Sequence, residues 1–382
     1  MDKLPAVNFL FAALALLSLG LTLWLWIVAR RFPLHQRLAD KSFAPAVTLL
    51  KPLKGCDTET AACLRSWLAQ DYLGPMQFLF GVAAADDAVC EVVRTLLAEF
   101  PQRDAQLVVC PEALGANAKV STLIQLERRA RHEVIVISDA DVRAPEDFLS
   151  NAVAALREEK VGLVNCFYQL ANPATTAMRW EAVAVNADFW SSVLQSRSLA
   201  PLDFALGAAM VTRRKQLAEI GGFAAIVSCL ADDYQLGHRI ARCGHRIELT
   251  PVVVECWSAP MDWRAVWRHQ LRWARTIRVS KPVGYFFSIV TNAILWPVLW
   301  VVAFPGFLSV GFLLVCLIAR ILTALHLQWK LTLSAAGDAA WWLVPVKDLL
   351  AAATWLLAFT GNRIEWRGDR YRLRRDGTLE KV

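Results

Sequence analysis

The residues at 134–142 read V-I-V-I-S-D-A-D-V, and they restrict the possible folds more than any other stretch of the chain. Four consecutive apolar residues predict a strand buried on both faces, as in a parallel sheet covered by helices. Asp139 and Asp141 then flank Ala140, at the carboxyl end of the strand, where open α/β sheets bind ligands. Two such carboxylates can share a divalent cation, which can in turn hold a diphosphate. The alternative is an acidic turn that caps the next helix.

Residues 45 to about 255 alternate between strand-like and helix-like segments, which predicts an α/β domain with a mainly parallel sheet. Besides the strand at 134, strands are expected at 46–50, 78–83, 107–110, 162–168 and 204–212. The three strands before residue 134 also end in polar residues, and together these describe a rim that suits a nucleotide and its phosphates. Taken singly, each is equally explained as a surface lysine, a helix cap or a turn residue. The residues are Lys51, Asp86, Asp87, Asn117 and Lys119.

Two later segments add candidate functional residues. The string L-A-D-D-Y at 230–234 opens a helix that is expected to run to about Cys243. One aspartate can cap that helix, and the second carboxylate is then a candidate general base. A helix at 263–279 is rich in Trp and Arg and includes Arg272 and Trp273, which predicts an interfacial helix on a membrane.

Apolar blocks near both ends of the chain predict membrane segments. Residues 7–29 carry no charge, and a bilayer crossing takes ~20 apolar residues. Arg30 and Arg31 follow directly, so the positive-inside rule places the amino terminus outside and the chain from residue 30 onward in the cytoplasm. A cleaved signal peptide would have a basic start and a shorter apolar core, so we expect a signal anchor.

The second apolar block follows Lys281, and its spans at 285–304 and 306–325 are expected to form a hairpin. A third stretch at 339–359 contains Lys347 and Asp348. Because a charge pair inside a bilayer is costly, we expect this stretch to be buried against protein, kinked or interfacial rather than a full crossing. Six arginines between residues 363 and 375 then favour a cytoplasmic carboxyl terminus.

Composition excludes several classes of protein. The net charge of +7 lies largely beside the membrane segments and in the tail, which favours anionic lipid headgroups over nucleic acid. Nine Cys without a C-x-x-C pair indicate neither a zinc site nor a disulfide framework, and they suit a reducing cytosol. The chain has neither G-x-G-x-x-G nor G-x-x-x-x-G-K-[ST], so neither a dinucleotide-binding fold nor a P-loop is supported.

Taken in order, these segments resemble the membrane-anchored family A glycosyltransferases, and most closely the ceramide glucosyltransferase family with its bacterial hopanoid-type relatives. The resemblance covers nearly the whole chain and implies a GT-A (nucleotide-diphospho-sugar transferase) domain between amino-terminal and carboxyl-terminal membrane helices. The strings that carry it are L-L-K-P-L-K-G (49–55), G-x-N-x-K (115–119), D-A-D (139–141), G-A-A-M-V-T-R-R (207–214), A-D-D-Y (231–234), R-W (272–273) and W-R-G-D-R-Y-R-L-R (366–374).

The resemblance implies a role for each matching residue. Asp86 or Asp87 would contact the uridine, and Asp139 with Asp141 would hold Mg²⁺ or Mn²⁺ on the diphosphate. The catalytic base would be Asp233.

The (Q/R)-x-x-R-W motif of these enzymes lines the donor and acceptor side of the pocket, which corresponds to Arg272 and Trp273. Its first position departs from the family pattern, because His269 stands in place of Gln or Arg.

The implied reaction is transfer of a hexose, with inversion, from a UDP-sugar to the hydroxyl of a membrane lipid. UDP-glucose with ceramide is expected, and UDP-N-acetylglucosamine with the hopanoid bacteriohopanetetrol is the alternative. A processive polysaccharide synthase and a non-catalytic UDP-sugar-binding protein are weaker alternatives. We expect a multi-pass protein of a bacterial inner membrane, with no nucleic acid partner. Its expected parts are an anchor (1–30), a linker (31–44), a catalytic domain (45–260), an interfacial helix (261–281), membrane segments (282–360) and a basic cytoplasmic tail (361–382).

Overall fold

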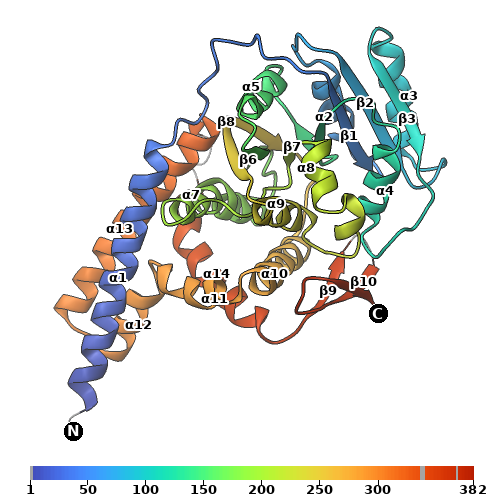
Figure 1. The fold of residues 1–382 in the computed structure, drawn as a ribbon. Coiled ribbons are helices and arrows are strands. Elements are labelled where there is room, and N and C mark those ends of the chain that lie inside the picture. Colours follow the sequence, from blue (N-terminus) through green and yellow to red (C-terminus); the bar gives the residue numbers. More distant parts are fainter. Residues whose placement is uncertain (1–2, 336–339, 367–368) are drawn as a thin grey trace.

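The computed structural model describes residues 3–335, 340–366 and 369–382, so Ala339 of the third apolar stretch and Arg367 of the tail lie outside the described residues. An α/β domain lies at one end of a group of long helices (Figure 1). The longest of these helices, α1 (Lys3–Arg31), extends away from the sheet, and its amino-terminal end is far from the α/β domain.

The central sheet has eight strands in the order β3-β2-β1-β4-β7-β6-β8-β5. The strands β1 to β4 are parallel, β7 is antiparallel to both of its neighbours, β8 is parallel to β6, and β5 is antiparallel to β8. The predicted mainly parallel sheet is therefore confirmed. The strands are β1 (Val47–Leu53), β2 (Met76–Val82), β3 (Asp104–Val109), β4 (Val134–Ser138), β5 (Val142–Arg143), β6 (Val161–Leu170), β7 (Ala209–Arg213) and β8 (Arg246–Cys256).

Two hydrophobic clusters, one on each face of the sheet, hold the helices in place. On one face lie α2 (Thr60–Leu68), α3 (Val89–Glu99) and α5 (Phe148–Ala154). The other face is covered by α4 (Ala118–Glu127), α6 (Thr176–Val183), α7 (Trp190–Arg197), α8 (Arg214–Glu219) and α9 (Asp232–Arg242), and a π-helical segment, η2 (Ala184–Phe189), joins α6 to α7. Both faces of β4 are therefore covered, and all five of its residues are buried, as the sequence predicts.

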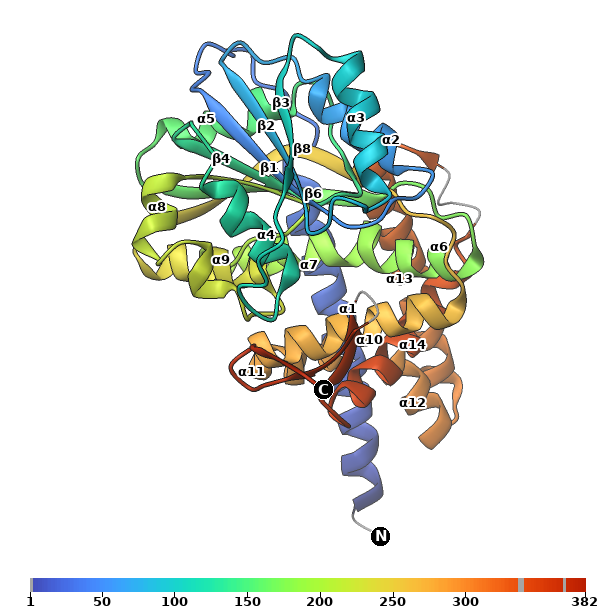
Figure 2. The ribbon, with the colours of Figure 1, turned by 90° about the vertical axis from the view of Figure 1, so that its right-hand side faces the viewer.

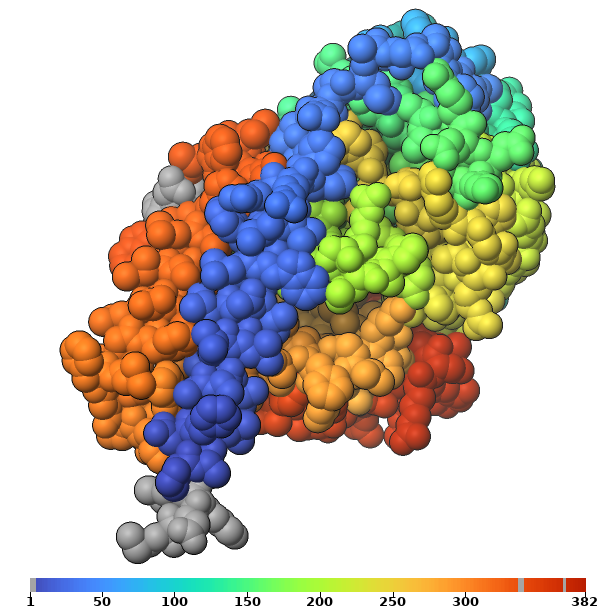
Figure 3. All heavy atoms as spheres, turned by 60° about the vertical axis from the view of Figure 1, so that its left-hand side comes forward, coloured from blue at the N-terminus to red at the C-terminus, as the bar shows by residue number. Residues whose placement is uncertain are grey.

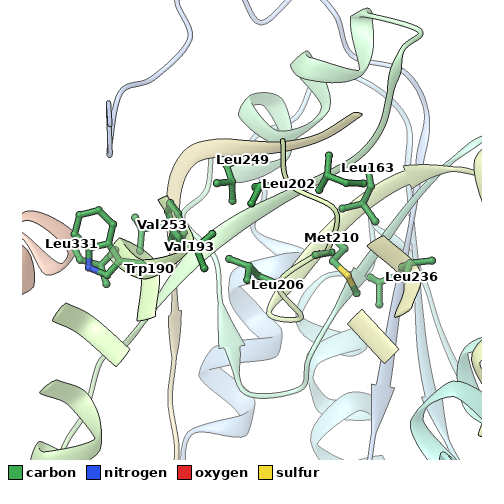
Figure 4. Packing of buried hydrophobic residues seen from close by; sticks show 14 of the residues in the cluster. Leu163, Trp190, Val193, Leu202, Leu206, Met210, Leu236, Leu249, Val253 and Leu331 are labelled. Carbon is green, nitrogen blue, oxygen red and sulfur yellow. The ribbon is translucent and has the colours of Figure 1, made fainter. Parts of the chain in front are cut away.

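The second face also anchors the membrane segment α13 (Phe307–Thr332). Leu331 near the end of α13 lies beside Trp190 of α7, and both belong to the same buried cluster (Figure 4). Helix α1 packs against α7, α12 and α13. In the space-filling view, α1 crosses the molecule as a continuous column between the α12–α13 region and the α/β domain (Figure 3).

Two helices are long and apolar enough to span a membrane, namely Pro5–Arg31 and Phe307–Thr332. The span expected at 285–304 is instead bent by 58° at a short break, and it counts as a third candidate only if both halves form one span. Its parts are α11 (Pro282–Phe287), η4 (Ser288–Thr291) and α12 (Leu295–Ala303). The break is stabilised by Asn292, whose Oδ1 accepts hydrogen bonds from the backbone N–H groups of Ile294 and Leu295 at 3.2 and 2.9 Å.

The third apolar stretch forms α14 (Leu343–Ala358), in which Asp348 is buried and Lys347 is mostly covered by protein. Asp348 pairs with the Arg320 guanidinium of α13 at 2.8 Å, and Arg320 also binds Asp188 of η2 at 2.8 Å. Lys347 completes the cluster through Asp188 and Asp348. Four alternating charges thus join the apolar helices α13 and α14 to the α/β domain, and this mutual pairing explains how the charges are tolerated among apolar residues.

The expected basic tail folds into an antiparallel sheet of three strands, β9 (Arg363–Trp366), β10 (Asp369–Leu373) and β11 (Leu379–Lys381). This sheet lies beside the expected interfacial helix, α10 (Trp263–Ser280), below the α/β domain (Figure 2). Leu379 donates its backbone N–H to Ser228 at 2.7 Å, and Leu230 donates to Gly377 at 3.1 Å. The tail is therefore hydrogen-bonded to the loop that precedes α9.

Candidate active site

The turn that holds Asp139 and Asp141 is fixed from behind by a buried lysine. Lys51, at 0% exposure, donates to Ser138 Oγ at 3.1 Å and to the backbone carbonyl of Asp139 at 2.6 Å, and its ammonium lies over the Trp67 ring. Burial lowers the pKa of Lys51 to about 8. Lys51 therefore supports the turn from within the protein and does not line an open surface.

Lys119 brings together two acids that are far apart in the sequence. Its ammonium lies 2.7 Å from Asp139 Oδ1 and 2.9 Å from Asp232 Oδ2. Lys119 is only 7% exposed, and although burial alone would lower its pKa, the two carboxylates outweigh burial and raise the pKa well above its usual value. The end of β4 and the start of α9 are thus joined by a buried cation.

Asp233 lies next to this network but is not part of the ion pair. Its Oδ1 accepts the backbone N–H of Tyr234 at 2.7 Å. Its Oδ2 faces Gly207, where an added Cβ would come within 2.8 Å of that oxygen. Burial and the neighbouring Asp232 carboxylate raise the pKa of Asp233 to about 6. A carboxyl group with such a pKa can accept a proton near neutral pH.

The expected helix cap is absent from this end of α9. The residue at the N-cap position is Ala231, and both aspartates belong to the first turn of the helix. The acidic pair is therefore used otherwise: Asp232 in the Lys119 network, and Asp233 beside Gly207.

Asp141 is exposed, yet the surrounding protein and the nearby Asp139 carboxylate raise its pKa to about 6. Two acids that disfavour each other's charge are a suitable donor pair for a cation. Among residues 3–335, 340–366 and 369–382, no group of three or more His, Cys, Asp or Glu could hold a metal ion. A Mg²⁺-type site of one or two carboxylates completed by substrate phosphates is consistent with this arrangement.

The remaining rim residues are separated by the structure into exposed and buried groups. Asp86 is exposed, whereas both carboxylate oxygens of Asp87 accept the backbone N–H of Gly55 at 3.0 Å. Asn117 is at 0% exposure, where it caps α4 through the Val120 N–H. Asp87 and Asn117 thus fix loops at the rim, and Asp86 stays accessible there.

Helix α10 carries both Arg272 and Trp273, and Trp273 belongs to an aromatic row. Trp273 contacts Phe189 of η2 at a ring-centroid distance of 6.1 Å, and Phe189 contacts Tyr168 at the end of β6 at 5.5 Å. His269, the departure from the family pattern, stacks edge-on against Trp273 at 4.7 Å. Tyr168 lies at the end of this row, and burial, with the Cys256, Asp233 and Asp139 charges adding to it, raises its pKa well above the usual value.

Glu181 is a site residue that the sequence does not reveal. At 1% exposure, it accepts hydrogen bonds from His269 Nδ1 at 2.7 Å and Gln270 Nε2 at 2.8 Å. Asp232 and Tyr168 were likewise not expected at the site. An acidic residue on the buried side of an amphipathic helix is the one signal that could have indicated Glu181.

This fold, with acids gathered at the carboxyl end of β4 and the start of α9, defines a GT-A-type glycosyltransferase. The fold is similar to that of mannosyltransferase PcManGT from Pyrobaculum calidifontis in complex with GDP-Man and Mn2+, with a TM-score of 0.53 and 22% identity, over 91% of this chain and 98% of that one. The chain belongs to glycosyl transferase family 21, whose model matches residues 8–379.

The named relatives are only distantly similar to this chain, at 23–25% identity. The chain is 25% identical to ceramide glucosyltransferase 3 of Caenorhabditis elegans over 219 residues, 56% of this chain and 47% of the relative. It is 23% identical to an N-acetylglucosaminyltransferase of Bradyrhizobium diazoefficiens over 244 residues, 61% of this chain and 49% of the relative. The match therefore spans about half the length of these relatives.

Proposed function

We propose that this glycosyltransferase moves glucose from UDP-glucose to the hydroxyl of ceramide, with inversion at the anomeric carbon. The observation that carries the proposal is the position of Asp233, next to the Lys119–Asp139–Asp232 network but not paired with Lys119. A single displacement needs one base and a stabilised leaving group, and it needs no second carboxylate as nucleophile.

In this proposal Asp233 accepts the proton of the acceptor hydroxyl as the oxygen attacks the anomeric carbon. The pKa of about 6 keeps the carboxyl largely ionised at pH 7 and still basic enough to take the proton. Gly207 leaves room for the Asp233 carboxylate, since an added Cβ would come within 2.8 Å of its Oδ2. Asp232 acts indirectly, since its bond to Lys119 fixes the start of α9.

Asp139 and Asp141 are proposed to hold Mg²⁺ or Mn²⁺ together with the donor diphosphate. When bound, the cation would offset the charge that grows on the leaving diphosphate. Lys119 binds one Asp139 oxygen and so orients that carboxylate for its second oxygen to act as a ligand. Lys51 is proposed to hold the turn rigid through its bonds to Ser138 and the Asp139 carbonyl.

The nucleotide is proposed to lie on the rim next to Asp86, because that acid is exposed while Asp87 and Asn117 fix the loops around it. Arg272 is proposed to contact the diphosphate, and Trp273 to line the acceptor side. The Glu181 carboxylate would keep this part of α10 in register through His269 and Gln270.

A lipid acceptor is supported by the apolar helices on both sides of the catalytic domain. The two helices of spanning length, Pro5–Arg31 and Phe307–Thr332, both pack against the α/β domain. The positive-inside rule favours a cytoplasmic domain, because Arg30 and Arg31 directly follow the first of them. A bacterial inner membrane is the proposed location.

The hopanoid reaction, from UDP-N-acetylglucosamine to bacteriohopanetetrol, is the second candidate, and the similarity to a bacterial N-acetylglucosaminyltransferase favours it. A processive polysaccharide synthase is weaker, since it must move its polymer through a pore. A non-catalytic UDP-sugar-binding protein is weaker still, because it needs no base beside its nucleotide site.

The test is a transfer assay on membranes that contain the full chain. Labelled UDP-glucose and UDP-N-acetylglucosamine are each supplied with ceramide or bacteriohopanetetrol, and released UDP and labelled lipid are measured. UDP-glucose with ceramide should give labelled lipid, and Asp233→Asn should abolish it while UDP still binds. Glu91→Gln, on the exposed side of α3, is the matched control and should leave turnover unchanged. Transfer by the Asp233→Asn enzyme at a near-normal rate would refute the assignment of the base.

A further inference from the structure

A cavity lies between α10, the segment that follows α14, and the carboxyl-terminal sheet, and none of the acids of the candidate active site lines it. Its volume is about 880 Å³. Among the described residues that line it, none is Asp or Glu, whereas five are arginines. These are Arg275, Arg278, Arg363, Arg372 and Arg375.

Two of the arginines are held in place by the protein. Arg275 donates to the backbone carbonyl of Arg363, and Arg278 donates to Asn362 Oδ1. The Arg278 guanidinium also lies over the Phe359 ring, 5.7 Å from its centroid. Both side chains are therefore ordered by contacts that leave other N–H groups of each guanidinium available.

The same two arginines carry buried donors with no partner. Within the described residues, the Nε atoms of Arg275 and Arg278 are both buried, and neither makes a hydrogen bond. Burial and the nearby Arg278 charge lower the pKa of Arg275. These two Nε–H groups are closed off from solvent and lie out of reach of an anion, but the repulsion among the five guanidinium groups would be relieved by an anion in this cavity.

The cavity lies where apolar segments meet the polar domain. Helix α11 begins at Pro282 directly after α10, and α14 ends just before Phe359; both Pro282 and Phe359 line the cavity. The neighbouring Phe286 and Phe287 are exposed large apolar side chains. Such a boundary is the level at which phospholipid phosphates lie beside a membrane protein.

We propose that this arginine cavity binds a phosphate group, supplied either by an anionic phospholipid headgroup or by a free phosphate. An arginine guanidinium can donate two parallel hydrogen bonds to phosphate oxygens. The five arginines of the cavity therefore offer more donors than one phosphate group needs. The site is distinct from the donor diphosphate site, because none of Asp139, Asp141, Asp233 or Arg272 lines it. It does not depend on the proposed acceptor.

The experiment uses the full chain in detergent. Three probes are titrated separately: dioctanoyl phosphatidylglycerol, dioctanoyl phosphatidylcholine and inorganic diphosphate. Binding is followed by native mass spectrometry and by the shift in melting temperature. The test variant is the double change Arg372→Gln/Arg375→Gln, at two exposed cavity residues. The control is Arg370→Gln/Arg374→Gln, which removes the same charge from β10 and the turn after it, outside the cavity, at the cost of the exposed Arg374–Glu380 ion pair.

The wild type and the control should bind phosphatidylglycerol more tightly than phosphatidylcholine, and the cavity variant should lose at least about tenfold in affinity. Binding of diphosphate without a preference for phosphatidylglycerol, with the same loss in the cavity variant, would identify a free phosphate as the ligand. The proposal is overturned if neither anion binds the wild type, or if the cavity variant binds like the control. Arg375→Gln alone gives the same test should the double variant fail to fold.

Discussion

The two neighbouring aspartates at the start of α9 should respond to the same substitution in opposite ways. Asp232 lies 2.9 Å from the Lys119 ammonium and is 7% exposed, whereas Asp233 has the Tyr234 N–H and the Gly207 backbone as neighbours. Asp232→Asn removes an ion pair and should reduce stability. Asp233→Asn removes a charge that the Asp232 carboxylate repels, so this change should not reduce stability.

The size of the effect follows from the geometry. At 2.9 Å, an effective dielectric constant of about 20 gives a Coulomb attraction of roughly 6 kcal/mol, which is an upper limit. Hydrogen bonds to charged groups contribute about 1.5–3 kcal/mol net, and Lys119 keeps Asp139 as a partner. A loss of about 2–3 kcal/mol is therefore expected for Asp232→Asn. At roughly 2–4 °C per kcal/mol, its melting temperature should fall by about 4–12 °C.

Two measurements on the same preparations test this reasoning. Thermal unfolding of the full chain in detergent should show the fall for Asp232→Asn and no fall for Asp233→Asn. UDP release should drop by about 10²–10⁴-fold for Asp233→Asn, the usual contribution of a general base, and much less for Asp232→Asn. The roles would be reversed, and the reasoning refuted, if Asp233→Asn turned over normally while a fully stable Asp232→Asn did not.

Three further outcomes are expected. Since the pKa of Asp233 is raised to about 6, the carboxyl is protonated below that pH and cannot act as a base; kcat/KM should therefore rise through about pH 6, and a limb near pH 4 would contradict this. Removal of divalent cations with a chelator should abolish transfer, and Mg²⁺ or Mn²⁺ should restore it; full activity without either would exclude the cation role of Asp139 and Asp141. Arg320→Met leaves the buried Asp348 and the partly buried Asp188 with one lysine and should cost about 3–5 kcal/mol of stability; thermal unfolding should show this loss, and no comparable loss for the exposed Arg31→Met.

The parallel strands of the sheet were predicted well from the sequence. The uninterrupted apolar run of β4 and the polar residues at the strand ends are both local signals. The prediction missed β8, which contains Pro251. A proline normally argues against an inner strand. Here the register with β6 shifts between Cys166 and Tyr168, so the proline falls at an irregularity of the ladder.

The side-chain contacts within the candidate site were harder to predict from the sequence than the helices and strands. Lys51 reads as a rim residue, but its position in a strand that is buried along its whole length turns the ammonium under the acidic turn. Lys119 and Asp232 meet where Asn117, at the start of α4, is hydrogen-bonded to Val227 and Cys229 in the loop before α9, a long-range contact that no local pattern encodes. The break at Asn292 was likewise invisible in the hydropathy of the span, since one capping side chain decides it.

The fold gives the carboxyl-terminal string W-R-G-D-R-Y-R-L-R a structural role beside the candidate site. Tyr371 and Leu373 of β10 form a small buried cluster with Leu230, which precedes Asp232 and Asp233 by only two and three residues. Leu230 also donates its N–H to Gly377. The backbone before α9 is thus held by the tail on one side, while Lys119 holds Asp232 on the other. The residue proposed for proton transfer and the last strands of the chain therefore form one structural unit, although the apolar helices α13 and α14 lie between them in the sequence.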